Sequence, residues 1–159
     1  MGKVLSYILN GYPGAIARSL DDVVVALANK SGAALDFGVA VAMDTAHTGV
    51  VKFDPTTHTG ADFVGITVRN PSKTPDTYGS NVGSYGKDDM VDVLVRGHIV
   101  ARLDSYDGKL GDQVGISTTD GSFVTETGSG VVTLPNVRVS NVRDAAGCAE
   151  FLLTERNVL

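Results

Sequence analysis

This 159-residue sequence has little of several features that mark common classes of protein. Its one cysteine, Cys148, excludes an internal disulfide, and the surrounding Ala-Ala-Gly-Cys-Ala run indicates a small packed residue rather than a nucleophile. There is no tryptophan. No stretch approaches the ~18 consecutive apolar residues of a membrane span, and the first residues lack the charged-then-apolar pattern of a secretion signal. The sequence therefore predicts a soluble protein.

An excess of basic charge is also missing. The formal net charge is -5, which argues against a surface that holds nucleic acid or an anionic membrane. The 43% hydrophobic content and 19% charged content are those of a globular chain, and the length fits one domain. Any partner is therefore expected to be a protein.

The residues needed for catalysis or metal binding are not grouped in the sequence. His47, His58 and His98 lack the spacing of metal ligands. The segment Asp104–Gly108 resembles the start of a calcium loop but lacks the later oxygen ligands and the closing glutamate. There is no nucleophile elbow and no glycine-rich phosphate loop. We expect no metal, no cofactor and no enzymatic activity.

The clearest pattern is an alternation from Met90 to Asp104, which predicts one long strand with a buried face. Gly97 keeps the phase of this alternation and is the expected point of a bend, as at a barrel corner. We expect the odd-numbered positions to line the core together with Phe37, Val39 and Val41. The odd-numbered apolar residues are Val91, Val93, Val95, Ile99, Ala101 and Leu103.

The rest of the chain predicts short strands separated by turns. Residues Leu20–Ala28 fit both a helical spacing and a strand, and the run of three valines favours the strand. We expect nine to eleven strands, and so an all-β, single-domain β-barrel or jelly-roll-like sandwich. The other expected strands are Leu35–Met43, Val50–Phe53, Phe63–Arg69, Gln113–Thr118, Ser122–Thr127, Val131–Leu134, Val137–Val142 and Ala149–Leu153.

Two segments stand outside this pattern of strands. Residues 1–18 are expected to form an extended N-terminal arm, because an apolar run precedes a Tyr-Pro-Gly turn that cannot continue a strand. The β domain then covers residues 19–159. Within it, residues 70–89 form a long loop rich in glycine, proline and serine, and such loops are often functional or mobile. Both segments are candidates for contact with a partner.

Five segments occur in an order that carries a resemblance to a known family. They are Gly11–Arg18, Leu35–Val41, Phe63–Arg69, Met90–Gly97 and Cys148–Phe151. In this order the chain resembles the capsid decoration proteins of tailed bacteriophages that form the structural cement family. The resemblance implies an all-β barrel or jelly-roll-like protein that binds the outside of a filled capsid and reinforces it.

The resemblance also implies partners and a place. The partners are the major capsid protein and further copies of the chain, with a homotrimer favoured and a dimer possible. The location is the capsid exterior of a virion, after synthesis in the host cytoplasm. The candidate residues for contact with the capsid or a neighbouring subunit are Leu5, Tyr7, Ile8, Tyr12, Pro13, Arg18, Tyr78 and Tyr85.

Two alternative functions stay open on the sequence. A receptor- or carbohydrate-binding β module would need exposed aromatic side chains, for which Tyr78 and Tyr85 are the candidates. A small oligomeric β-barrel enzyme would need polar groups that converge in a pocket.

Overall fold

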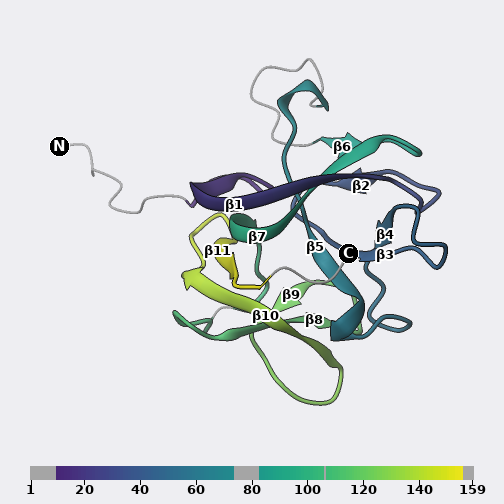
Figure 1. Cartoon of the computed structure of the whole chain (residues 1–159). Helices are drawn as coiled ribbons and strands as arrows, with labels where there is room; N and C mark the ends of the chain where they lie inside the picture. The colour runs from purple at the N-terminus through teal and green to yellow at the C-terminus, as the bar shows by residue number, and fades with distance from the viewer. Residues whose placement is uncertain (1–9, 74–82, 106, 156–159) are drawn as a thin grey trace.

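The computed structural model describes residues 10–73, 83–105 and 107–155. Within them, nine strands form one antiparallel sheet that curls into a half-barrel, and β2 and β6 form a small second sheet (Figure 1). The short 3-10 helices η1 (Gly60–Asp62) and η2 (Pro71–Lys73) lie between strands. This confirms the predicted all-β, single-domain fold. The strands are β1 (Ile16–Ala28), β2 (Leu35–Asp36), β3 (Ala40–Met43), β4 (Val50–Lys52), β5 (Phe63–Thr67), β6 (Ser84–Tyr85), β7 (Met90–Arg102), β8 (Gln113–Ser117), β9 (Phe123–Val124), β10 (Val131–Asn141) and β11 (Cys148–Leu153).

Strand β7 is the centre of the large sheet. Strand β1 pairs with it along one edge, from Ala28 opposite Met90 to Ile16 opposite Ile99. Strand β5 pairs with the first half of β7, and β11 pairs with the second half. Because β1 already occupies one edge, β5 and β11 share the other. The sheet therefore divides at β7 into a β5-β3-β4 branch and a β11-β10-β8-β9 branch, which curl around the core.

Gly97 lies where β7 passes from β5 to β11. Its φ of +121° is a backbone conformation that residues with a side chain rarely adopt. A Cβ atom at this position would lie 2.0 Å from Oδ1 of Asp22. That carboxylate oxygen instead accepts a hydrogen bond from the backbone N–H of His98 at 3.1 Å. The bend thus requires glycine both for its dihedral angle and for the close approach of β1.

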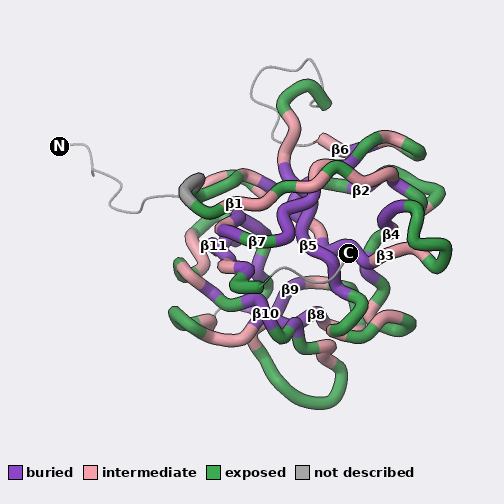
Figure 2. Tube along the Cα trace, viewed as in Figure 1, coloured by how far each residue is buried: buried purple, intermediate pink, exposed green. Residues whose placement is uncertain are grey.

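The bend changes which core the odd-numbered residues of β7 enter. The residues before Gly97 pack in a small core against β2, β3 and β6, and those after it pack in a larger core inside the half-barrel. Figure 2 shows that buried residues lie along the central strands and exposed residues along the outer loops. Leu94, on the even face, also lies in the larger core. The prediction that the odd face is buried is confirmed, and on the even face only Leu94 and Val100 are buried as well. Val91, Val93, Val95, Ile99, Ala101 and Leu103 are all fully buried.

The predicted strand Leu35–Met43 is interrupted in the structure. Gly38 has a φ of +71°, and a Cβ atom there would lie 2.7 Å from the backbone N of Gly14 and 2.8 Å from Cβ of the half-buried Pro13. The chain therefore breaks between β2 and β3 to accommodate the turn from the N-terminal segment. As a result Val39 is half-buried, although we expected it in the core.

The two predicted strands at Val131–Leu134 and Val137–Val142 are one strand, β10. The register between β10 and β8 shifts between Thr133 and Arg138, across the proline that cannot donate to the ladder. The side-chain amide of Gln113 donates to the carbonyl oxygens of Leu134 and Val137 in this interval. Side-chain hydrogen bonds thus replace part of the ladder and keep the strand continuous.

Candidate functional site

Of the predicted N-terminal arm, residues 10–15 are hydrogen-bonded to the sheet, and Ile16–Arg18 already form the start of β1. The backbone N–H of Asn10 donates to the Asp144 carboxylate at 2.7 Å. Its side-chain amide donates to the carbonyl oxygens of Val142 and Cys148, both at 2.8 Å. The chain is therefore fixed to the β10–β11 turn at Asn10. Leu5, Tyr7 and Ile8 lie outside the described residues.

The Tyr-Pro-Gly turn is fixed to the centre of the sheet. The backbone N–H of Ala15 donates to the carbonyl oxygen of Tyr12 at 2.9 Å and closes the turn. Gly14 donates to the carbonyl oxygen of Val100 at 2.8 Å and accepts from the backbone N–H of Arg69 at 2.7 Å. The Arg69 guanidinium lies over the Tyr12 ring, 5.6 Å from its centroid. Tyr12 is nonetheless 47% exposed, so its ring is available to a partner.

Arg18 forms an ion pair within its own chain. Its Nε lies 2.9 Å from Oε1 of Glu150, and that carboxylate side chain is 9% exposed. The Ser140 hydroxyl donates to the same oxygen at 2.9 Å. A buried carboxylate requires such partners, because leaving it unpaired would cost several kcal/mol. Arg18, a candidate contact residue on the sequence, is thus bound by β11 of its own chain.

Tyr85 is a core residue, which corrects its prediction as a contact residue. Its side chain is fully buried in the small core, and its ring meets Phe37 edge-on with centroids 5.4 Å apart. The hydroxyl donates to the carbonyl oxygen of Val68 at 2.6 Å, and burial raises the pKa of Tyr85 to about 12. Tyr78 lies outside the described residues. The binding-module alternative therefore loses one of its two candidate aromatics.

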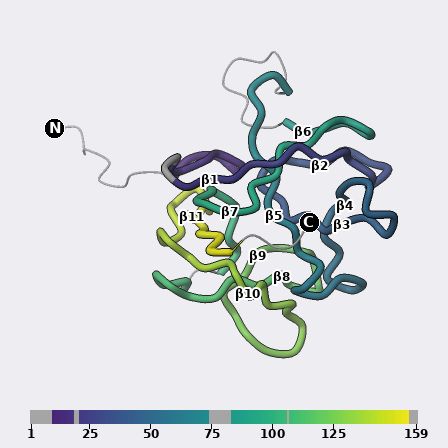
Figure 3. The backbone as a smooth tube through the Cα atoms, viewed as in Figure 1, coloured from purple at the N-terminus to yellow at the C-terminus, as the bar shows by residue number. Residues whose placement is uncertain are grey.

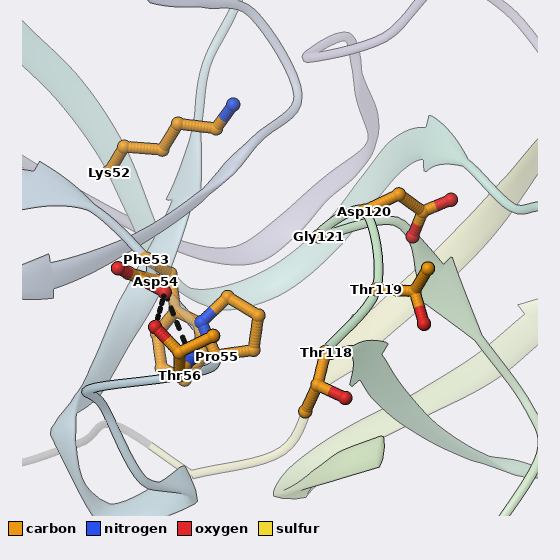
Figure 4. A pocket seen from close by; sticks show the side chains of 9 residues that line it. All are labelled: Lys52, Phe53, Asp54, Pro55, Thr56, Thr118, Thr119, Asp120 and Gly121. Carbon is orange, nitrogen blue, oxygen red and sulfur yellow. Dashed lines mark hydrogen bonds between the residues drawn. The ribbon is translucent and has the colours of Figure 1, made fainter. Parts of the chain in front are cut away.

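A groove marks the place where the half-barrel remains open (Figure 4). Residues 52–56, at the end of β4, form one wall, and residues 118–121, in the β8–β9 turn, form the other. The groove continues past Phe53 and Gly121 into a hollow beside β3 and the end of β7. Strands β4 and β9 are the last strands of the two branches, and in the described part of the chain they do not pair with each other.

The carboxylates of this groove are engaged in their own turns. Asp54 accepts from the hydroxyl and the backbone N–H of Thr56, and the hydroxyl bond lowers the pKa of Asp54 most. Asp120 accepts from the backbone N–H and the hydroxyl of Ser122, which lower its pKa in the same way. These bonds hold the turns that form the two walls.

The histidines and acidic residues do not gather into a metal site in the described residues. No three His, Cys, Asp or Glu side chains there are placed to hold one ion. His58 Nδ1 accepts the backbone N–H of Asp54 at 2.9 Å, so this histidine serves a turn. The thiol of Cys148 is buried, and burial raises its pKa.

Strand β1 has an edge that carries no partner in the described part of the chain. It pairs with β7 on one edge, and just past its end Asn29 bridges to Val50 of β4, so the other edge is open only as far as Leu27. The five residues Val23–Leu27 on this edge include no charged side chain, and Val24 is 41% exposed. Natural sheets usually protect such an edge with charges or proline. The sequence predicted this strand but we did not predict its open edge. The run of uncharged residues was the signal that could have indicated it.

Comparison with known protein families and structures shows what kind of protein carries this fold. The signature of the family described as "Structural cement protein (E217 gp24/Pam3 gp6)" matches residues 3–154. The chain belongs to this phage cement family. A chain in the solved capsid of Myoviridae phage XM1 is similar in fold, with a TM-score of 0.74 and 17% identity over 97% of this chain and 96% of that chain. The comparison with curated proteins gave no match.

Family membership confirms the resemblance that the order of sequence segments carried. The cement protein is a structural component of the virion that binds the phage capsid and stabilises it. In the described residues no helix has the length and apolar character that a membrane span requires.

Proposed function

We propose that this cement protein binds the outer surface of the capsid through its N-terminal segment. Residues 10–18 would hold the segment to the β domain, and residues 1–9 would contact the major capsid protein or a neighbouring subunit. The observation that supports this most is the anchoring of Asn10, which fixes the point from which the apolar residues Leu5, Tyr7 and Ile8 begin.

The surface around this anchor is suited to a protein partner. Tyr12 is 47% exposed, Ile16 is 39% exposed, and Val142, whose carbonyl binds Asn10, is 44% exposed. Large apolar side chains that gather around one segment favour a contact surface over solvent. The net charge of -5 favours protein over nucleic acid as the partner.

We propose a homotrimer as the assembled form. Cyclic assembly allows several individually weak contacts to act together on a repeating lattice. The resemblance to decoration proteins favours three copies over two.

Removal of residues 1–9 is expected to lower capsid binding at least tenfold while leaving the fold intact. If residues 1–9 serve a partner as proposed, and not the core of their own chain, the shortened protein should keep the melting temperature of the full chain. The measurement is co-sedimentation of each protein with capsids that lack the cement protein. The matched control is Leu110→Ala, which shortens a 65% exposed apolar side chain in the β7–β8 loop and should bind as the full chain does. Equal binding of the shortened and full chains would refute the role of the segment.

A further inference from the structure

We propose that the open edge of β1 at Val23–Leu27 receives Leu5–Leu9 of a second copy of this chain as an added strand. The inference rests on the proposed function, in which residues 1–9 contact a partner, and it names that partner and its binding surface.

The edge of β1 offers the main-chain groups that an added strand needs. Strand β7 occupies one edge of β1, and in the described part of the chain the other edge is open up to Leu27, before the bridge from Asn29 to Val50. No charge between Val23 and Ala28 opposes an incoming strand. Strand addition at such an edge gains affinity from main-chain hydrogen bonds, and side chains at alternate positions add specificity.

The small core beside this edge is not fully covered. Val23, Val25 and Leu27 point from β1 toward that core and are only half-buried, as is Met43 on β3. An added strand places every second side chain on the same face. In the N-terminal segment these would be Leu5, Tyr7 and Leu9, all apolar, which would extend the small core over its open side.

Length and charge match the segment to the edge. Leu5–Leu9 and Val23–Leu27 are uncharged runs of five residues, and pairing Leu5 with Val23 places Leu5, Tyr7 and Leu9 on the face of Val23, Val25 and Leu27. Lys3 precedes the first run, Asp21 and Asp22 precede the second, and Lys30 follows it. The orientation that places Lys3 beside the two aspartates is favoured, because the reverse orientation places it beside Lys30.

The segment must come from another copy, because that of the same chain would run the wrong way. Asn10 is bound to Cys148, which pairs with Arg102 of β7, whereas Leu27 pairs with Val91 near the other end of β7. In the favoured orientation Leu9 lies beside Leu27. Consecutive Cα atoms are only about 3.8 Å apart, so Leu9 of the same chain cannot lie beside Leu27 while Asn10 is bound near the opposite end of β7.

An exchange of this kind can close into a ring. Each copy donates one segment and receives one, which is a heterologous contact, and heterologous contacts close when the rotation between copies allows it. The inference therefore gives the proposed trimer a physical contact between neighbours.

Disulfide trapping in the full-length protein tests the inference. One preparation carries Ser6→Cys and the other, labelled with a heavier isotope, carries Val24→Cys. After mixing and mild oxidation, free in solution and on capsids, mass spectrometry should find the mixed disulfide at least fivefold above that formed with Leu110→Cys, an exposed control position. Ile8→Cys should pair less with Val24→Cys, because the favoured orientation places Ser6 opposite Val24, whereas the reverse orientation would place Ile8 there. Mixed disulfides no more frequent at Val24 than at Leu110 in both settings would overturn the inference.

A charge on the edge provides a second test. Ala26→Lys, at an exposed position of β1, should reduce the mixed disulfide at least fivefold, whereas Ala34→Lys, exposed in the β1–β2 turn, should not. An unchanged yield with Ala26→Lys would contradict strand addition. If residues 1–9 prove necessary for capsid binding but no mixed disulfide forms, the proposed function stands and this inference fails.

Discussion

Replacement of Gly97 with alanine is expected to lower the free energy of unfolding by about 3 kcal/mol or more. The new Cβ would lie 2.0 Å from Oδ1 and 2.9 Å from Cα of Asp22, and backbone atoms cannot move aside cheaply. The φ of +121° adds a strain of roughly 1–3 kcal/mol for a residue with a side chain. Because β1, β5 and β11 all pair with β7, displacement of this bend would disturb both branches of the sheet.

Gly111→Ala is the matched control for this prediction. Gly111 has a φ of +85°, but a Cβ atom there would meet nothing within 4 Å. Alanine at this position should cost only the strain, about 1–2 kcal/mol. Urea unfolding of both variants measures the difference. If the two substitutions cost the same, the close packing of Asp22 against Gly97 does not contribute to stability.

Phe151→Ala is expected to cost about 3–5 kcal/mol, the usual range for a phenylalanine removed from a core. Phe151 is fully buried in the larger core, and its ring meets Phe123 edge-on with centroids 5.2 Å apart. On β11 it lies opposite Ile99 of β7 and Val139 of β10. The ring therefore joins the centre of the sheet to the end of one branch.

The neighbouring Leu152→Ala variant provides the comparison for Phe151. Leu152 is only half-buried, so its truncation should cost clearly less. Thermal unfolding of the two variants at one pH gives the ranking. A larger loss for Leu152→Ala would mean that the core does not lie on the face of β11 that the structure assigns to it.

The alternation of apolar and polar residues predicted those features of the strands that depend only on consecutive residues. The long strand around Gly97, its bend and its buried odd face could all be predicted from the sequence, because burial of every second residue shows as an alternation in consecutive residues. Even here the burial of Leu94 was missed, since its partner Ile66 comes from β5 and not from the strand itself. The break at Gly38 was likewise missed, because it depends on Pro13 and Gly14 more than twenty residues earlier.

The contact residues were harder to predict than the strands. Tyr85 looked like a surface aromatic because its loop is polar, yet its hydroxyl finds an acceptor in Val68, and this allows the ring to enter the core. The pairing of Arg18 with Glu150 joins residues far apart in the sequence and has no local signature. The order of the five segments did predict the family correctly. The order of several strands along the chain is more specific than any one of the short motifs.

The stability of capsids with and without the protein tests the central claim most directly. Capsids that lack the cement protein would be heated after incubation with the purified full-length chain or with buffer, and the temperature at which they rupture would be recorded together with the amount of chain bound. We predict that the chain binds to saturation and that the rupture temperature rises by several degrees as the sites fill. Saturating binding with an unchanged rupture temperature, or no binding at all, would contradict the assignment of this chain as a protein that binds and stabilises the capsid.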